Sequence, residues 1–336
     1  MVTRRLYSAP APERRTPPRR AARMAPAACA GHSEAAGSAT ARAGVTSTST
    51  LSQEPKMTRS PLSLALLGLV CAGGLSACAQ QPAQQTSQPP APALSDQLVM
   101  ATLWMQTSGE YAALSHQAFN LARRNLDRAL AASDGQQRPP AIVVDVDETV
   151  LDNTPYEAWL IASGQDYQSA TWQQWVDKAS ARAMPGAKAF LDYAASRGVE
   201  VFYITNRRAE ETQATLRNLR QVGFPDADEA HFLPRAKSSD KSARRQRVAQ
   251  SHWVILLMGD NLGDFSAGFD RDTAEARRAA VEAQPDAFGS RYIVLPNPAY
   301  GAWEGALYQN NWHLSDEQKA RARHNHLQMW SGPETP

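Results

Sequence analysis

The chain has 336 residues, of which 43% are hydrophobic and 20% charged, a composition typical of a globular protein with a substantial core. Its formal net charge of +2 conceals an uneven distribution, because after residue 78 the acidic residues outnumber Lys and Arg by 30 to 25. This acidic balance excludes a nucleic-acid-binding footprint.

Residues 1–56 are rich in Arg, Ala, Pro, Ser and Thr and show no apolar periodicity. Such a segment cannot bury enough surface to offset its ordering entropy, so we expect it to be disordered. A signal-peptide pattern begins only at Met57, and a signal peptide must lie at a true N-terminus. We therefore expect translation to start at Met57 and residues 1–56 to be a non-native extension.

Residues 57–78 have the order of a bacterial lipoprotein signal peptide. Arg59 supplies a basic start, and residues 62–72 form an apolar run too short to span a bilayer as a mature helix. The stretch Leu75-Ser-Ala-Cys78 is similar to a lipobox, which implies lipidation of Cys78. The alternative is a chance apolar stretch near a cysteine.

The residues after Cys78 fit an exported, anchored protein. Ala79, rather than Asp, follows the cysteine, which by analogy with Gram-negative lipoproteins implies the outer membrane, on its periplasmic or surface face. Residues 79–93 form a Gln/Pro-rich tether. No cysteine follows Cys78, so the domain beyond it is expected to contain no disulfide.

Strand and helix patterns alternate along the remaining chain. Residues 95–132 predict amphipathic helix with a break near Gly109. Continuous apolar runs predict strands buried on both faces, as in a parallel sheet: Ala141–Val146, Val199–Thr205, Trp253–Met258 and Arg291–Leu295. Helical patterns follow at Pro185–Arg197, Ala209–Val222, Asp240–Ala249 and Thr273–Ala283. This alternation predicts an α/β fold with a mostly parallel sheet flanked by helices.

The segment 152–184 is too long for a loop, so it predicts a small cap beside the sheet. It is rich in aromatic residues: Tyr156, Trp159, Tyr167, Trp172 and Trp175.

Polar side chains gather where the predicted strands end, and ligand sites in open α/β sheets form at the carboxyl ends of the strands. Clustered carboxylates repel one another unless a cation neutralises them, and oxygen ligands favour Mg²⁺. One carboxylate can act as a nucleophile and a second as acid and base. The residues at these ends are Asp145, Asp147, Thr205, Asn206, Asp260 and Asp264, with Lys241 at the start of a helix.

These residues stand in motifs that resemble a known group. DVDET, ITNR, the Lys of SDKSARR and GDNLGDF match in order the four motifs of the haloacid dehalogenase (HAD) superfamily of phosphatases. DVDETVLDN, TWQQWVDKASARAMPGA, VFYITNRR and LPNPAYGAWEGAL are similar to the class C nonspecific acid phosphatases, the bacterial outer-membrane lipoprotein acid phosphatases and 5′-nucleotidases. The resemblance covers roughly residues 94–307 and implies a Rossmann-like HAD core over 94–336, with a helical cap at about 152–184.

The resemblance also implies roles for the site residues. Asp145 is expected to be the nucleophile and a Mg²⁺ ligand, and Asp147 the acid/base, with its backbone carbonyl on the single metal ion. Lys241 is expected to steady the phosphoryl group, with Lys237 as the alternative. Thr205 and Asn206 would bind phosphate, although helix capping is an alternative. Asp260 and Asp264 would complete the metal site; Gly263 stands where relatives often carry another Asp.

Several further residues have simpler interpretations. Tyr300, Trp172 and Tyr156 are candidates for substrate contacts, with core packing as the alternative. We interpret Glu148 as structural and Asn153 as a helix cap. The run Arg244, Arg245 and Arg247 is interpreted as a solvated helix face.

The resulting expectation is a lipid-anchored, Mg²⁺-dependent acid phosphatase. It would hydrolyse small phosphomonoesters, such as nucleoside 5′-monophosphates or aryl phosphates, through an aspartyl-phosphate. Two alternatives stay open: a phosphotransferase to alcohol acceptors, and a surface-anchored binding protein with a vestigial site. A homodimer also stays open.

Overall fold

The computed structural model describes residues 94–332. The predicted extension at 1–56, the signal peptide at 57–78 with Cys78, and the tether at 79–93 lie outside the described residues. Within that part of the chain, no helix is both long and apolar enough to cross a bilayer.

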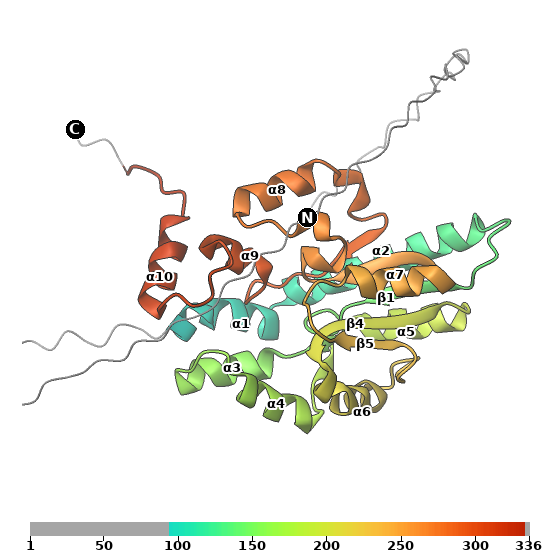
Figure 1. Cartoon of the computed structure of the whole chain (residues 1–336), viewed down its shortest axis with the longest axis horizontal. Coiled ribbons are helices and arrows are strands. Elements are labelled where there is room, and N and C mark those ends of the chain that lie inside the picture. The colour runs from blue at the N-terminus through green and yellow to red at the C-terminus, as the bar shows by residue number, and fades with distance from the viewer. Residues whose placement is uncertain (1–93, 333–336) are drawn as a thin grey trace, which may run out of the picture. The chain divides into compact units, whose positions relative to one another are not determined.

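Five parallel strands form the central sheet, in the order β5-β4-β1-β6-β7 (Figure 1). All four predicted strands are confirmed as members of this sheet, with β1 in its middle. The strands are β1 (Pro140–Val144), β4 (Glu200–Arg208), β5 (Phe232–Arg235), β6 (Trp253–Gly259) and β7 (Tyr292–Val294).

The apolar pattern does not predict β5, because Phe232-Leu-Pro-Arg235 has only four residues and includes Pro234. A proline lacks the N–H of a sheet ladder and is tolerated at an edge, and β5 is an edge strand. β4 also runs beyond its predicted end at Thr205, so Asn206 and the two arginines after it lie within the strand.

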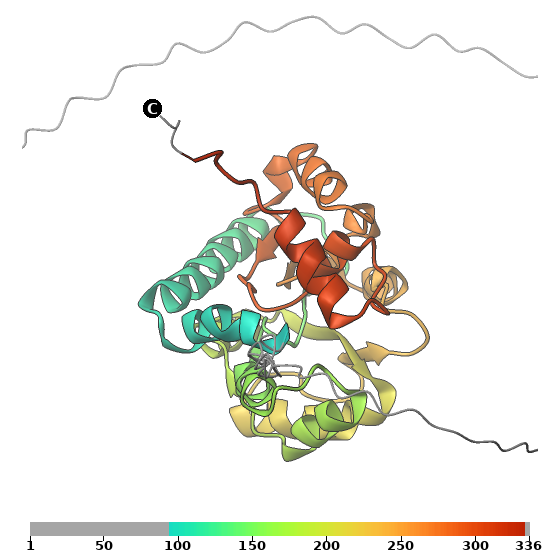
Figure 2. The same cartoon turned by 90° about the vertical axis from the view of Figure 1, so that its left-hand side faces the viewer.

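Helices cover both faces of the sheet (Figures 1 and 2). Alternate strand residues face opposite sides: Ile142 and Val144 enter one apolar cluster, Ala141 and Val143 the other. The first cluster includes residues of α2 (Gly109–Ala131), α5 (Ala187–Ser196) and α6 (Thr212–Val222), and the second includes residues of α7 (Ser242–Ser251) and α8 (Ala274–Glu282).

The break predicted near Gly109 is confirmed. η1 (Leu94–Leu98) and α1 (Val99–Thr107) precede Ser108, whose hydroxyl accepts a hydrogen bond from the Tyr111 N–H and caps α2. The shorter helices later in the chain are η2 (Ala209–Glu211), η3 (Leu262–Asp264), η4 (Ala267–Phe269), η5 (Pro285–Ala287), α9 (Ala302–Gly305), η6 (Ala306–Tyr308) and α10 (Asp316–Asn325).

The segment 152–184 contains the two helices of a small cap, α3 (Thr154–Ser163) and α4 (Ser169–Lys178). An antiparallel pair, β2 (Leu151–Asp152) and β3 (Arg182–Ala183), closes its base. Tyr156, Leu160, Trp172 and Val176 are buried in its centre, against Ala214 of α6.

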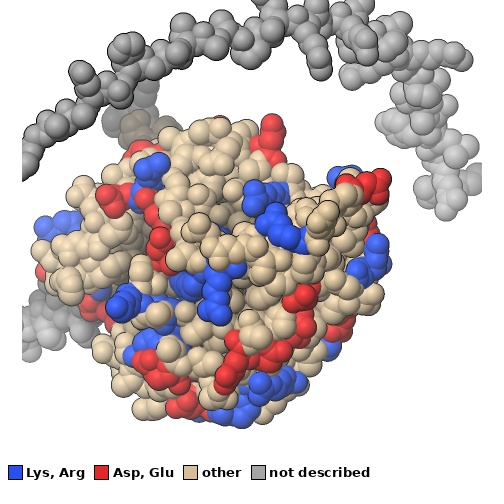
Figure 3. All heavy atoms as spheres, turned by 45° about the vertical axis from the view of Figure 1, so that its right-hand side comes forward, with Lys and Arg blue, Asp and Glu red and all other residues tan. Residues whose placement is uncertain are grey.

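Charged side chains of both signs are interspersed on the face shown in Figure 3, without a broad basic patch on that face. The two ends of the described chain meet, since Arg323 of α10 donates to Gln97 of η1 at 2.8 Å. This contact joins the segment that follows the predicted tether to the C-terminal helix (Figure 2).

Candidate active site

The carboxyl ends of β1, β4 and β6 bring together the predicted site residues. The backbone N–H of Asp145 continues the β1–β6 ladder by donating to the Met258 carbonyl at 2.9 Å. Asp260 follows β6 directly, and Thr205 lies near the end of β4. Residues more than 100 positions apart therefore share one edge of the sheet, because neighbouring parallel strands end at the same edge.

Three carboxylates form the acidic centre of this edge. One oxygen from each of Asp145, Asp260 and Asp264 lies within 4.8 Å of the others. Gly259 permits this approach, since a Cβ there would lie only 2.1 Å from Oδ2 of Asp264. The same Oδ2 accepts a hydrogen bond from the Asn261 N–H at 2.9 Å, which fixes the loop after β6.

Lys241 lies between two of these carboxylates. Its Nζ donates to Oδ1 of Asp264 at 2.6 Å and also to Oδ1 of Asp145, and all three side chains are buried. Burial alone would lower the pKa of Lys241, but the two carboxylates raise it above its ordinary value. Lys241 is therefore the lysine that reaches the site, while the alternative, Lys237, is exposed.

The acidic centre carries more negative charge than Lys241 can compensate. Burial raises the pKa of Asp145 to about 7, against the opposing effect of Lys241. Burial, with Asp145 and Asp264, raises the pKa of Asp260 well above its ordinary value. Oxygen ligands in such a setting fit a hard divalent cation, so Asp145, Asp260 and Asp264 are the residues that could hold one.

Asp147 is held apart from this centre by a different set of donors. Arg207 Nε and Asn153 Nδ2 each donate to its Oδ1 at 2.9 Å. Its other oxygen, Oδ2, accepts only a long contact of 3.4 Å from the Thr205 hydroxyl. One carboxylate oxygen is thus fixed, and the other keeps most of its hydrogen-bonding capacity.

Asn153 occupies the N-cap position of α3, as interpreted, but its side chain makes no capping hydrogen bond. Its amide instead connects the cap to the sheet: Oδ1 accepts from Trp175 Nε1 at 2.8 Å and from Arg207 Nη2 at 3.1 Å. The amide oxygen is engaged here because a residue at the cap–sheet junction faces both layers. Trp175 is thereby a structural partner of the site.

The interpretation of Arg244 and Arg245 as a solvated helix face is wrong. Arg244 donates to the Thr205 carbonyl and, at 2.8 Å, to the Asn206 amide oxygen. Arg245 donates to the carbonyl of Gly263 at 2.7 Å. Both guanidinium groups fix loops of the site, whereas Arg247 is exposed as expected.

Glu148 is structural, as interpreted. Its side chain is buried, its φ is +55°, and its Oε1 accepts the Asn153 N–H at 2.8 Å. Burial, with Asp147 and Asp260, raises its pKa well above the ordinary value. A neutral Glu148 can hold the tight turn after Asp147 without adding charge.

The aromatic candidates lie in different places. Tyr156 and Trp172 are buried in the cap and pack edge to face, with ring centroids 5.2 Å apart. Tyr300 is half-buried, and its N–H donates to Oδ1 of Asn297 at 3.3 Å. Asn297 Nδ2 donates to Oδ2 of Asp260 at 2.8 Å, so Tyr300 is joined to the acidic centre through a single residue.

Comparisons with known proteins identify relatives of the chain. The model of the HAD superfamily, subfamily IIIB (acid phosphatase), matches residues 71–303. A class C acid phosphatase from Bacillus anthracis is 44% identical, with a TM-score of 0.68 over 71% of this chain and 100% of that chain. The same enzyme with tungstate bound gives a TM-score of 0.69.

Plant proteins are more distant relatives. A stem 28 kDa glycoprotein from Glycine max is 24% identical over 47% of this chain and 58% of its own length. Acid phosphatase 1 from Solanum lycopersicum is 29% identical over 47% of this chain and 57% of its own length. The match with these plant relatives thus spans little more than half of their length.

Proposed function

The chain belongs to the acid phosphatases of HAD superfamily subfamily IIIB, and on this premise we propose that it hydrolyses small phosphomonoesters with Asp145 as the nucleophile. The observation that carries the proposal is the contact of one buried carboxylate, Asp145, with Lys241 beside two further carboxylates. Burying these charged groups is costly, and a catalytic role gives a reason for the cost.

Asp145 and Asp147 divide the two steps of the reaction. Asp145 attacks phosphorus, the bond from phosphorus to the alcohol oxygen breaks, and Asp147 gives its proton to that oxygen. An alcohol and an aspartyl-phosphate result. Asp147 then takes a proton from water, whose oxygen attacks phosphorus; the bond to Asp145 breaks, and inorganic phosphate leaves. Arg207 and Asn153 orient Asp147 for both proton transfers through its fixed Oδ1.

The phosphoryl group would lie among Lys241, Thr205 and Asn206. The ammonium group of Lys241 is fixed beside the nucleophile, where it disperses negative charge that develops on the phosphoryl oxygens. When bound, Mg²⁺ would be held by Asp145, Asp260 and Asp264 and would supply further positive charge at the same place. The tungstate in the Bacillus anthracis enzyme supports an oxyanion site, since tungstate and phosphate are both tetrahedral oxyanions.

Nucleoside 5′-monophosphates or aryl phosphates are the proposed substrates. Support comes from Tyr300, a half-buried aromatic residue whose ring packs against the core and whose backbone N–H is joined to Asp260 through Asn297. A flat leaving group can stack on such a ring. The lipobox-like sequence ending at Cys78 supports attachment to the outer membrane, which mass spectrometry of the native N-terminus would test by detecting an acylated cysteine.

Turnover of p-nitrophenyl phosphate by the purified chain with Mg²⁺ tests the proposal. We expect Asp145→Asn to lower kcat by about a thousandfold or more, because the amide is a poor nucleophile. Undiminished turnover would refute the assignment. Adding an alcohol acceptor separates hydrolysis from phosphotransfer by its products, and absence of Mg²⁺-dependent turnover on a broad phosphate panel would favour a vestigial site.

A further inference from the structure

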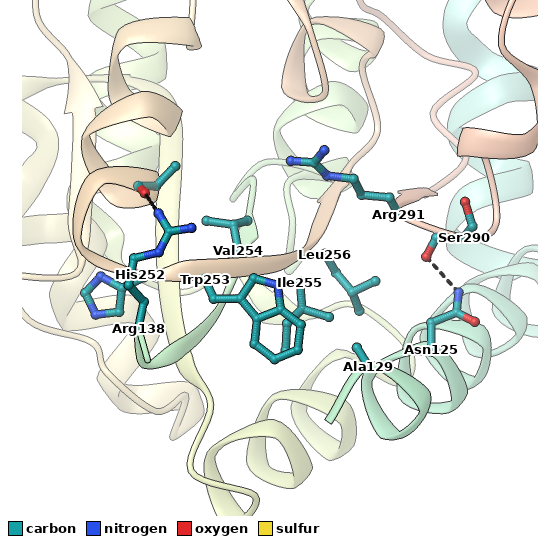
Figure 4. Close-up of a pocket in the computed structure, with 11 residues that line it drawn as sticks. Asn125, Ala129, Arg138, His252, Trp253, Val254, Ile255, Leu256, Ser290 and Arg291 are labelled. Carbon is teal, nitrogen blue, oxygen red and sulfur yellow. Dashed lines mark hydrogen bonds between the residues drawn. The ribbon is translucent and has the colours of Figure 1, made fainter. Parts of the chain in front are cut away.

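A hollow opens at the edge of the sheet opposite the active site, with a volume of about 500 Å³ (Figure 4). It lies at the amino-terminal ends of the strands, beside Trp253 at the start of β6. β6 has seven residues and leads directly to Asp260. At about 3.3 Å per residue, the hollow therefore lies roughly 20 Å from the carboxylates of the active site.

Two arginines approach the hollow from the strands that flank β6. Arg138 precedes β1, whose entry is paired with β6 through a hydrogen bond of 2.8 Å from the Trp253 N–H to the Pro139 carbonyl. Arg291 directly precedes β7, and its carbonyl accepts the Leu257 N–H at 3.0 Å. Figure 4 shows the Arg138 and Arg291 side chains on either side of Val254, with the Trp253 indole on the other side of the β6 ribbon.

The positive charge of this hollow has little local compensation. Within residues 94–332, the Arg291 side chain makes no hydrogen bond or ion pair, and the Arg138 side chain donates only to the backbone carbonyl of Ala249. Among the residues that the structure describes, no Asp or Glu lines the hollow. Two guanidinium groups facing one space favour an anion, and carboxylate and phosphate oxygens match their geometry.

The wall between the arginines is apolar. Trp253 is half-buried against the core, and Val254 and Ala129 line the hollow beside it. The amide nitrogen of Asn125 already has hydrogen-bond partners, since its Nδ2 donates to the carbonyls of Gly289 and Ser290 at 2.7 and 2.9 Å. His252 is likewise held, by Glu200 at 3.1 Å. A ligand would therefore meet an apolar wall and two arginines that have no carboxylate partner among the described residues, in a volume typical of small-molecule sites.

We propose that this hollow is a second binding site, separate from the active site, for a small organic anion. Its carboxylate or phosphate group lies between Arg138 and Arg291, and its flat apolar body packs against the wall that Val254 and Trp253 form.

Calorimetric titration of the full chain with naphthalene-2-carboxylate tests the proposal, because this probe has the required shape and charge and cannot be hydrolysed as a phosphomonoester. We expect one saturable site per chain. Arg138→Gln and Arg291→Gln each raise Kd by at least about tenfold, as the loss of a charge-assisted contact predicts. Arg278→Gln, an exposed arginine of α8 outside the hollow, leaves Kd unchanged, and the neutral probe 2-naphthalenemethanol binds at least about tenfold more weakly.

Each contrary outcome overturns the proposal. Absence of saturable binding does so, as does an equal Kd for the neutral probe or an unchanged Kd in both arginine variants. An Asp145→Asn variant serves as a second control: loss of binding there would place the probe in the active site instead. Far-UV circular dichroism and turnover at saturating substrate show that the two arginine variants are folded.

Discussion

The Arg207 guanidinium donates through Nε to Oδ1 of Asp147 at 2.9 Å, although almost none of its own side chain is exposed. Nη2 lies 2.8 Å from the same oxygen. Two nitrogens of one planar group thus fix a single carboxylate oxygen, and the second oxygen stays free for proton transfer. The buried Arg207 therefore orients Asp147, the acid/base of the proposed reaction.

Replacing Arg207 by Lys keeps the charge but removes the planar fork. We expect kcat to fall by about 10- to 100-fold, with KM changed by less than about threefold, because Asp147 loses its orientation while substrate contacts remain. Arg208→Lys is the matched control, since Arg208 bonds Glu211 rather than the site. Wild-type kcat in the Arg207 variant would show that the fork has no role in positioning.

Lys241→Met removes the ammonium group between Asp145 and Asp264. In EDTA we expect the free energy of unfolding to fall by about 3–5 kcal/mol, because breaking a buried ion pair leaves uncompensated charge. Urea denaturation measures this loss, and Mg²⁺ should restore part of it by supplying the missing charge. Lys237→Met, at an exposed position, should stay within about 0.5 kcal/mol of the wild type. Equal stability of both variants would contradict the account.

Divalent cations should stabilise the wild-type chain. If the three carboxylate oxygens within 4.8 Å of one another hold a cation that the unfolded chain cannot, Tm should rise with Mg²⁺ concentration and fall again in EDTA. Asp260→Asn should flatten this dependence, whereas Asp192→Asn, an exposed carboxylate of α5, should preserve it. The same Mg²⁺ dependence in both variants would place the ion elsewhere.

Much of the fold follows from the sequence because periodicity reports burial. The apolar runs at Ala141 and Trp253 predict central strands, since both faces of these strands are covered. Apolar periodicity does not predict the short edge strand β5, because Pro234 interrupts it and it is shorter than a typical strand. A weak local pattern can thus be overridden by pairing with β4.

The residues of the site likewise include some that the sequence predicts and some that it does not. Asp145, Asp260 and Lys241 are predictable because their chemistry stands in short motifs at strand ends. The roles of Arg207 and Arg244 depend on which loops lie beside them after folding, and no local pattern reports that. The sequence did contain one indication of a role for Arg207. It directly follows Thr205 and Asn206, and a polar residue beside two site residues is expected to contact the site.

Glu157 of α3 makes stability pH-dependent. Burial, with a smaller effect of Glu304, raises its pKa from 4.5 to about 7. The unfolded chain therefore loses this proton first, so the contribution of Glu157 is complete below pH 4.5 and is lost as pH rises through about 7. Glu157→Gln should increase the free energy of unfolding at pH 8 by up to about 3 kcal/mol relative to its effect at pH 4.

Urea denaturation at pH 4 and pH 8 checks this dependence. Glu110→Gln, at an exposed position of α2, is the control and should show no such difference. A Glu157→Gln variant with the same pH dependence as the wild type would mean that the carboxyl stays ionised in the folded chain.

The central claim is that Asp145 carries the phosphoryl group between the two steps. Rapid acid quenching of the wild-type chain during turnover of ³²P-labelled p-nitrophenyl phosphate, followed by peptide mapping, tests it most directly. The account predicts a hydroxylamine-labile label, as expected of an acyl phosphate, on the peptide that contains Asp145 and no label in Asp145→Asn. Label on another residue, or full turnover by the Asp145→Asn variant without label, would contradict it.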